Sequence, residues 1–254
     1  FVQGMERAPP DATGDERQVQ QFLAGTEASF RGHPAWQGAS EEDLDAAGEG
    51  LEKYVLTKLY PRLFGAYDAD RERDEVLASR LAALRKFVQP SHLDIPPHFV
   101  EQQGWLVAQE HLRKIDAYKA PRDKLVCVLN CCRVINNLLS AAAERLGPEQ
   151  AAGADDFLPI LIFNTIQACP EALESNLQYI QRFRNGSRLN GEEAYFYTNL
   201  VSATSFVETI DAESLSMDAA EFIAHMRREG VPGSELPLPP AAGDGPLDLL
   251  SADL

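Results

Sequence analysis

Basic residues are scarce in this sequence. The 254 residues include 23 lysines and arginines against 39 aspartates and glutamates, which gives a formal net charge of −16. Such an acidic chain repels phosphate backbones and anionic membrane surfaces. We therefore expect no direct binding to nucleic acid and none to anionic lipid.

Long apolar runs are missing as well. No stretch approaches the roughly 20 uninterrupted apolar residues that a membrane span needs, and the opening residues FVQGM lack the basic-then-apolar order of a signal peptide. These absences predict a soluble, intracellular chain without a membrane span. Because the chain begins with Phe1, we also expect the natural protein to extend further upstream.

Cysteines are few and form no paired CxxC motifs. Three of the four lie within six positions of a helical segment, which argues against a disulfide framework. On a helix Cys127 and Cys131 share a face, but no histidine lies at a matching offset to complete a metal site. We predict buried thiols in a reducing compartment and no metal.

Motifs of small-molecule enzymes are absent too. The sequence has no GxxxxGK[ST], GxGxxG or GxSxG, and its five histidines are scattered along the chain. Without a nucleophile beside a base, a metal cluster or a phosphate loop, action on a partner protein is favoured over binding of a small substrate.

Helical periodicity dominates the N-terminal third. Residues 1–13 show no periodicity and are predicted to be an irregular leader. Apolar residues then recur at helical spacing over 15–33, over 40–64 behind the capping-box-like Ser40, and over about 70–90, with a possible bend at Pro61. The simplest interpretation is a three-helix N-terminal bundle.

The remaining segments also predict helices. They cover 98–118, a stretch from Pro121 to about 146, 170–184 and 191–206. The run FLPILIFNTI fits a central core helix, with a strand as the alternative, and the absence of other alternating segments favours the helix. The fold class is therefore all-α. Past Arg228 the chain is rich in Pro, Gly and acid and predicts a disordered tail, in which LPLPP and PLDLLSADL are weak candidates for partner-binding peptides.

Two carboxylates precede the apolar helix. Asp155 and Asp156 stand directly before Phe157, where aspartate caps a helix by accepting a backbone N–H bond. If Asp156 is the cap, Asp155 lies one position outside the helix. It would then project from a rigid element and be available to a partner.

A second pattern lies in GEEAYFYTNLVSATSF. On a helix its hydroxyl-bearing residues form one stripe and its apolar residues form the opposite one. The stripes are Tyr195, Thr198, Ser202 and Ser205 on one side, and Phe196, Leu200, Ala203 and Val207 on the other. The hydroxyl stripe is either a solvated face or a docking surface, since tyrosine combines apolar area with a polar tip.

Five segments in order resemble a known family. DKLVCVLNCC, ADDFLPILIF, SNLQYIQRF, GEEAYFYTNL and FVETIDAESL are similar to the vacuolar protein sorting 9 domain, the catalytic domain of guanine-nucleotide exchange factors for early-endosomal Rab GTPases. The resemblance covers about residues 70–215 and is strongest, in its wording, to plant and algal members. The preceding helices resemble the bundle that flanks the domain in Rabex-like members. The predicted organisation is a leader and bundle over 1–69, the domain over 70–214, and a C-terminal helix with a tail over 215–254.

The resemblance also implies residue roles. The family's aspartate finger, which opposes Mg²⁺ and the β-phosphate of the GTPase-bound nucleotide, matches Asp155. The groove residues that hold the GTPase switch regions match Pro159, Tyr195 and Thr198. Further residues in matching segments, assigned mainly to core and groove support, complete the predicted GTPase-binding set: Phe157, Leu158, Asn176, Tyr179 and the stripe residue Ser202.

The implied activity is the release of GDP from a Rab-five-class GTPase, without covalent chemistry. No cofactor of the chain's own is implied, because GDP, GTP and Mg²⁺ belong to the GTPase. The implied setting is the cytoplasm, with recruitment to endosomes by an adaptor protein and a role in endocytic and vacuolar vesicle traffic. The alternative is a non-catalytic helical adaptor that binds a GTPase or coat protein without exchanging nucleotide.

Overall fold

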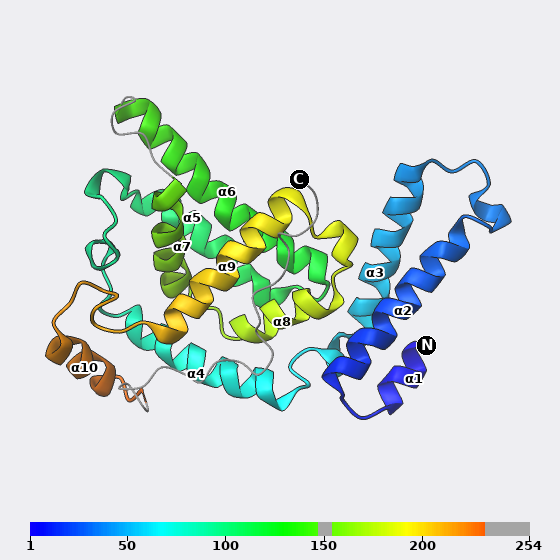
Figure 1. The fold of residues 1–254 in the computed structure, drawn as a ribbon, viewed down its shortest axis with the longest axis horizontal. Helices are drawn as coiled ribbons and strands as arrows, with labels where there is room; N and C mark the ends of the chain where they lie inside the picture. Colours follow the sequence, from blue (N-terminus) through cyan, green and yellow to red (C-terminus); the bar gives the residue numbers. More distant parts are fainter. Residues whose placement is uncertain (147–153, 232–254) are drawn as a thin grey trace, which may run out of the picture.

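The fold is built from helices. The computed structural model describes residues 1–146 and 154–231, and every regular element in those ranges is helical, as the all-α prediction requires (Figure 1). The longer elements, joined by short 3-10 turns, are α1 (Val2–Arg7), α2 (Ala12–Phe30), α3 (Glu41–Leu63), α4 (Asp68–Leu84), α5 (Gln102–Arg113), α6 (Pro121–Leu146), α7 (Ala154–Ala168), α8 (Leu173–Phe183), α9 (Gly191–Thr209) and α10 (Ala219–Arg228).

Two hydrophobic cores organise these helices. The larger contains residues of α4 to α10, with α7 at its centre. The smaller joins α1, α2 and α3, and α8 contributes Tyr179 and Phe183 to it. α8 therefore takes part in both cores. The three-part division at residues 69–70 and 214–215 stays a prediction.

The predicted three-helix N-terminal bundle is wrong in its third member. Leu77, Leu81 and Leu84 of α4 are fully buried in the larger core rather than against α2 and α3. Periodicity shows that a helix has an apolar face but not which partner covers it. The third helix of the N-terminal group is α1.

The segment predicted as an irregular leader is also helical. α1 buries Met5, and the ring of Phe1 stacks on Phe22 with 4.0 Å between centroids. The Arg62 guanidinium donates to the carbonyl oxygens of Ala8 (3.1 Å) and Pro9 (2.8 Å). α1 has only one buried side chain, Met5, so its sequence shows no helical repeat of apolar residues. The bonds from Arg62 come from a distant part of the chain and leave no pattern in residues 1–13.

Local signals at helix starts are confirmed. Ser40 and Asp43 form a reciprocal capping box at the start of α3, and Pro121 is the first residue of α6. Pro61 lies inside the last turn of α3. These signals depend on neighbouring residues alone, so the sequence shows them directly.

The apolar run at 157–166 is a helix, so the strand alternative is wrong. Ile160, Leu161 and Ile166 of α7 are almost completely buried. α6 alone, among the described residues, is long and apolar enough to cross a membrane, but half of the relevant window is buried inside the protein. Its buried face packs in the larger core, which is typical of the core helix of a soluble protein. Residues 232–254, with the predicted tail, lie outside the described residues.

Candidate functional site

The first turn of α7 presents a carboxylate to solvent. α7 begins at Ala154, so Asp155 and Asp156 both lie within its first turn, and the predicted arrangement with Asp155 outside the helix is wrong. Asp155 is exposed and Asp156 is half-buried. Within ranges 1–146 and 154–231, no hydrogen bond or ion pair holds the Asp155 carboxylate. The positive end of the helix dipole favours a negative charge at this position.

Pro159 loosens the same turn. It has no backbone N–H, so it cannot donate the usual helical bond to the carbonyl oxygen of Asp155, four residues earlier. Leu158 and Pro159 are half-buried and form an apolar surface next to the carboxylate. The turn that carries Asp155 is therefore less restrained by backbone bonds than the rest of the helix.

α9 has the two faces that its sequence predicts. The hydroxyl stripe, formed by Tyr195, Thr198, Ser202 and Ser205, is exposed along its whole length, and the apolar stripe, formed by Phe196, Leu200, Ala203 and Val207, is buried. Tyr195 is 53% exposed, which is unusual for so large an apolar ring. α9 thus offers a continuous polar and aromatic surface to solvent.

Phe157 connects the carboxylate to this stripe. It follows Asp155 by two residues, is 4% exposed, and its ring centroid lies 6.5 Å from that of Tyr195 and 5.9 Å from that of Phe196. α7 packs on α9, and Phe157 joins the first turn of α7 to the N-terminal part of α9. Phe157 therefore joins the first turn of α7, which carries Asp155, to the turn of α9 that carries Tyr195.

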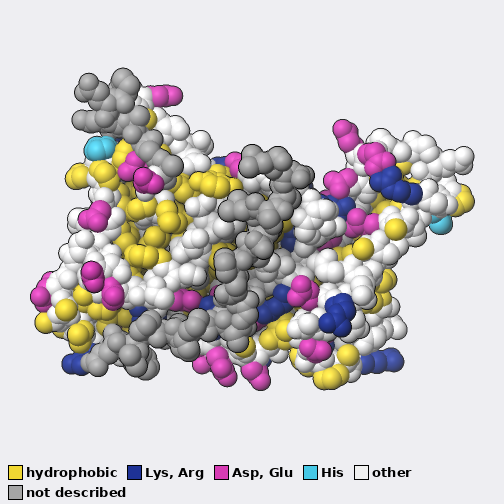
Figure 2. All heavy atoms as spheres, in the orientation of Figure 1, with side chains coloured by type: hydrophobic (Ala, Val, Ile, Leu, Met, Phe, Trp, Pro, Cys, Tyr) yellow, Lys and Arg dark blue, Asp and Glu magenta, His cyan; other side chains and the backbone are white. Residues whose placement is uncertain are grey.

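Apolar surface continues beside these two helices. α5 packs on α7 and exposes Leu106 (56%) and Val107 (47%). In Figure 2 hydrophobic side chains gather over α5 and α7, and acidic side chains border them. We call the exposed parts of Asp155, Leu158, Pro159, Tyr195, Thr198 and Ser202 the α7–α9 face.

Two predicted residues are not on this face. Asn176 is fully buried, accepts a hydrogen bond from Lys124 Nζ (2.5 Å) and donates one to Asp116 Oδ1 (2.7 Å). Tyr179 is buried in the smaller core, where its hydroxyl donates to the carbonyl oxygen of Leu56 (3.2 Å). Burial of both side chains agrees with the core support assigned to them, and their part in the predicted GTPase-binding set stays a prediction. They join helices internally, as does Phe157.

Lys124 is a buried charge that the sequence analysis does not single out. It is fully buried, donates to the carbonyl oxygen of Ile115 (2.9 Å), and lies 4.5 Å from the ring centroid of Phe64. Burial lowers its pKa from 10.5 to about 8, although Asp116 opposes the shift. The sequence signal for this buried charge is a lysine directly before Leu125, the first apolar residue of the buried stripe of α6.

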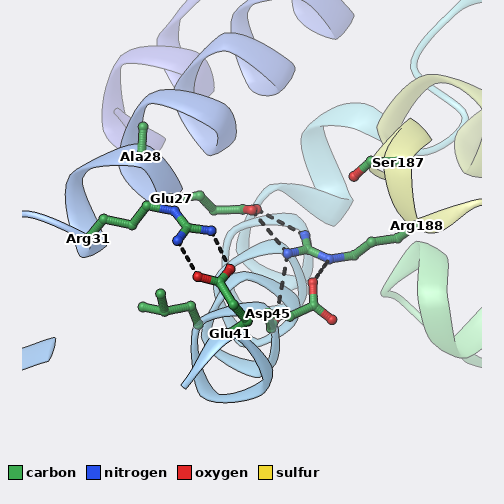
Figure 3. Close-up of a pocket in the computed structure, with 8 residues that line it drawn as sticks. Glu27, Ala28, Arg31, Glu41, Asp45, Ser187 and Arg188 are labelled. Carbon is green, nitrogen blue, oxygen red and sulfur yellow. Dashed lines mark hydrogen bonds and ion pairs between the residues drawn. The ribbon is translucent and has the colours of Figure 1, made fainter. Parts of the chain in front are cut away.

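A cluster of charges joins the N-terminal helices to α8 and the 3-10 turn η6 (Gly186–Arg188). A pocket of about 270 Å³ lies there between α2, α3 and η6 (Figure 3). Its arginines, Arg31 and Arg188, already bind carboxylates, so the pocket holds no free cation for an anionic ligand. No group of three or more His, Cys, Asp or Glu side chains in the described part of the chain could hold a metal ion.

Comparison with known proteins identifies two matching family models. Residues 105–212 match the vacuolar sorting protein 9 (VPS9) domain, and residues 1–60 match a domain of unknown function (DUF5601). The chain is 52% identical to vacuolar protein sorting-associated protein 9A of Arabidopsis thaliana over 226 residues, which are 89% of this chain and 43% of the relative.

Two further relatives are also similar to this chain. The rice (Oryza sativa subsp. japonica) protein of the same name is 51% identical over 87% of this chain and 46% of its own length. The human Rab5 GDP/GTP exchange factor is 36% identical over 75% of this chain and 39% of its own length. The chain therefore spans less than half the length of these relatives.

Proposed function

Since residues 105–212 belong to the VPS9 domain family, we propose that the chain is a guanine-nucleotide exchange factor that promotes GDP release from an early-endosomal Rab GTPase. The name of the human relative, a Rab5 GDP/GTP exchange factor, supports this partner class. The names of the plant relatives support a role in vacuolar sorting. The reaction makes and breaks no covalent bond, and the chain needs no cofactor of its own for it.

Asp155 is the proposed aspartate finger. It is exposed at the start of a helix, and no partner within the described residues neutralises it. A carboxylate placed about 4 Å from a phosphate charge opposes it by about 4 kcal/mol at an effective dielectric of 20, or about a thousandfold in affinity. In the proposed complex this charge enters the nucleotide site of the GTPase and displaces Mg²⁺ and the β-phosphate.

The rest of the α7–α9 face binds the GTPase in this proposal. Leu158, Pro159 and Tyr195 supply apolar and aromatic area, and Thr198 and Ser202 supply hydroxyls that donate or accept hydrogen bonds. Such a mixture of aromatic anchor and polar rim is typical of protein interfaces. Binding at this face delivers Asp155 to the nucleotide.

The observation that carries the proposal is the exposed Asp155 carboxylate in the first turn of α7, the turn that Phe157 packs against Tyr195 of α9. The test is release of fluorescent GDP from an early-endosomal Rab, with a late-endosomal Rab as the specificity control. We expect fast release with the wild type and a fall of at least about a hundredfold with Asp155→Ala. Glu72→Ala, which removes another exposed carboxylate from α4, should keep the wild-type rate.

The alternative is a non-catalytic adaptor. An adaptor needs the binding face but not the charge of Asp155. A well-folded wild type that binds the Rab without accelerating release would support the adaptor and contradict exchange. Full activity of Asp155→Ala would contradict the finger assignment but leave exchange standing.

We also propose that the protein acts in the cytoplasm and is brought to endosomes by a recruiting adaptor protein. The net charge of −16 disfavours direct attachment to anionic lipid, which supports recruitment by a protein. Flotation with vesicles that contain anionic lipid checks this. Binding to the vesicles without any added protein would contradict it.

A further inference from the structure

The first turn of α9 is held by two arginines. Glu192 forms a two-bond ion pair with Arg133 of α6, in which Nε lies 3.1 Å from Oε1. Glu193 Oε2 lies 3.7 Å from Nη2 of Arg184, which follows α8 directly. Tyr195 comes two residues after Glu193. The position of the aromatic anchor therefore depends on what holds these two glutamates.

Arg184 is itself bound to the N-terminal helices. Its guanidinium donates to both carboxylate oxygens of Glu49 (2.8 Å each) and to Glu52 (3.0 Å), both on α3. Its side chain is only 2% exposed. Arg184 thus connects α3 to the first turn of α9 through a buried guanidinium, whose partner Glu52 is 1% exposed and whose contact on α9, Glu193, is 31% exposed.

Arg188 makes a parallel connection three residues before α9. It binds both oxygens of Glu27 on α2 (3.0 Å each) and Oδ1 of Asp45 on α3 (2.8 Å), as Figure 3 shows. The guanidinium lies so close to α3 that a Cβ on Gly48 would be 2.2 Å from Nη2 of Arg188. A side chain at position 48 would therefore make the ends of Arg188 and Glu27 shift.

We propose that Arg184 and Arg188 are positioning residues that use α2 and α3 to set the orientation of the α9 stripe, and with it the affinity for the GTPase. This inference rests on the proposed function. In this proposal the arginines act through carboxylates of the same chain, on α2 and α3, and not by contact with the GTPase. The VPS9 family match begins at residue 105, after these helices, so the proposal extends the binding apparatus to residues 27–52.

The test combines exchange kinetics with hydrogen exchange of the free full-length chain. Gly48→Ala makes the ends of Arg188 and Glu27 shift, whereas Gly50→Ala on the same helix meets no atom within 4 Å and is the matched control. Arg188→Ala removes the side chain directly, and Arg188→Lys keeps the charge but not the two-bond geometry. Arg62→Ala breaks another arginine–carboxylate pair, to Asp15, within the N-terminal helices, and controls for stability alone.

For Gly48→Ala and Arg188→Ala we expect the half-saturating concentration in nucleotide exchange to rise about fivefold, with the maximal rate within about twofold. Arg188→Lys should recover part of the affinity. Amide protons of residues 194–196, the first of α9 with helical hydrogen bonds, should exchange about tenfold faster. Gly50→Ala and Arg62→Ala should leave both measurements at the wild-type value.

Unchanged half-saturation and unchanged protection of residues 194–196 in both Gly48→Ala and Arg188→Ala would overturn the proposal. An equal loss of affinity in Arg62→Ala would also overturn it, because general destabilisation would then explain the effect. A wild type without exchange activity would defeat the proposed function instead. In that case the hydrogen-exchange measurement would still decide whether the arginines position α9.

Discussion

Two regions of the molecule use charge in opposite ways. At the joint between the N-terminal helices and α8, carboxylates and arginines are paired and largely buried, as in the contact of Arg184 with Glu49 and Glu52. On the α7–α9 face the carboxylate of Asp155 is exposed. Paired buried charges hold helices in place, and a charge left free at a helix start is available to a partner. The same residue types therefore serve structure in one region and binding in the other.

The largest effect should follow from breaking the joint. Arg184→Ala leaves Glu52, which is 1% exposed, without its compensating charge, and burial already raises the pKa of that carboxyl. Breaking a buried ion pair on one side costs about 3–5 kcal/mol. We expect the free energy of unfolding to fall by that amount in urea denaturation.

The matched change is Arg31→Ala. Its ion pair with Glu41 has side chains that are 62% and 76% exposed, and such surface pairs contribute little to stability. An equal destabilisation by the two substitutions would remove the distinction between buried and exposed pairs.

The next effect concerns pH. The pKa of Lys124 is about 8 in the folded chain against 10.5 for an unperturbed lysine, chiefly because of burial. Between these values the unfolded chain binds more protons, so stability should rise with pH by about 3 kcal/mol from this group. Urea denaturation from pH 8 to pH 10.5 should show this rise in the wild type relative to Lys124→Met.

The control is Lys53→Met. Lys53 is largely exposed on α3, where it pairs with Asp123, and its removal should leave the pH dependence of the wild type in place. If Lys124→Met kept the wild-type slope, the buried lysine would not be the group responsible.

On the α7–α9 face the effects should appear in binding rather than in folding. Tyr195→Ala should weaken Rab affinity about tenfold, because an exposed aromatic anchor contributes most at an interface. The unfolding free energy should change by no more than about 1 kcal/mol. Tyr54→Ala removes a tyrosine of α3 that is 63% exposed and should leave titration with the Rab unchanged.

The smallest effects should come from the hydroxyls. Thr198→Ala and Ser202→Ala each remove one exposed hydrogen-bonding group and should weaken binding about threefold to tenfold. Ser205→Ala lies at the far end of the stripe and should have less effect. A uniform loss along the stripe, measured by calorimetry, would mean that the interface extends beyond Ser202.

The sequence was informative wherever a short pattern decides the structure. The capping box at Ser40 and the first-turn proline at Pro121 predicted the starts of α3 and α6, and the two stripes of 191–209 predicted which side of α9 is buried. Exposure of Tyr195 and Thr198 followed from the same spacing. These features depend on residues within one or two helical turns.

Contacts between distant residues could not be predicted in this way. Arg184 and Glu49 are 135 positions apart, and Tyr179 bonds to Leu56 across 123 positions. The motif containing Asn176 and Tyr179 suggested a binding role, but the partners that bury them lie on other helices. α4 was assigned to the wrong core for the same reason, since an apolar stripe does not identify the surface that covers it.

The most direct measurement is the rate of GDP release from an early-endosomal Rab, at saturating concentrations of the wild type and of Asp155→Asn. The substitution keeps the shape of the side chain and removes only its charge. The account predicts that release falls close to the spontaneous rate while the unfolding free energy stays within about 0.5 kcal/mol of the wild type. Release at the wild-type rate with Asp155→Asn would contradict the claim that the exposed charge of the α7–α9 face expels the nucleotide.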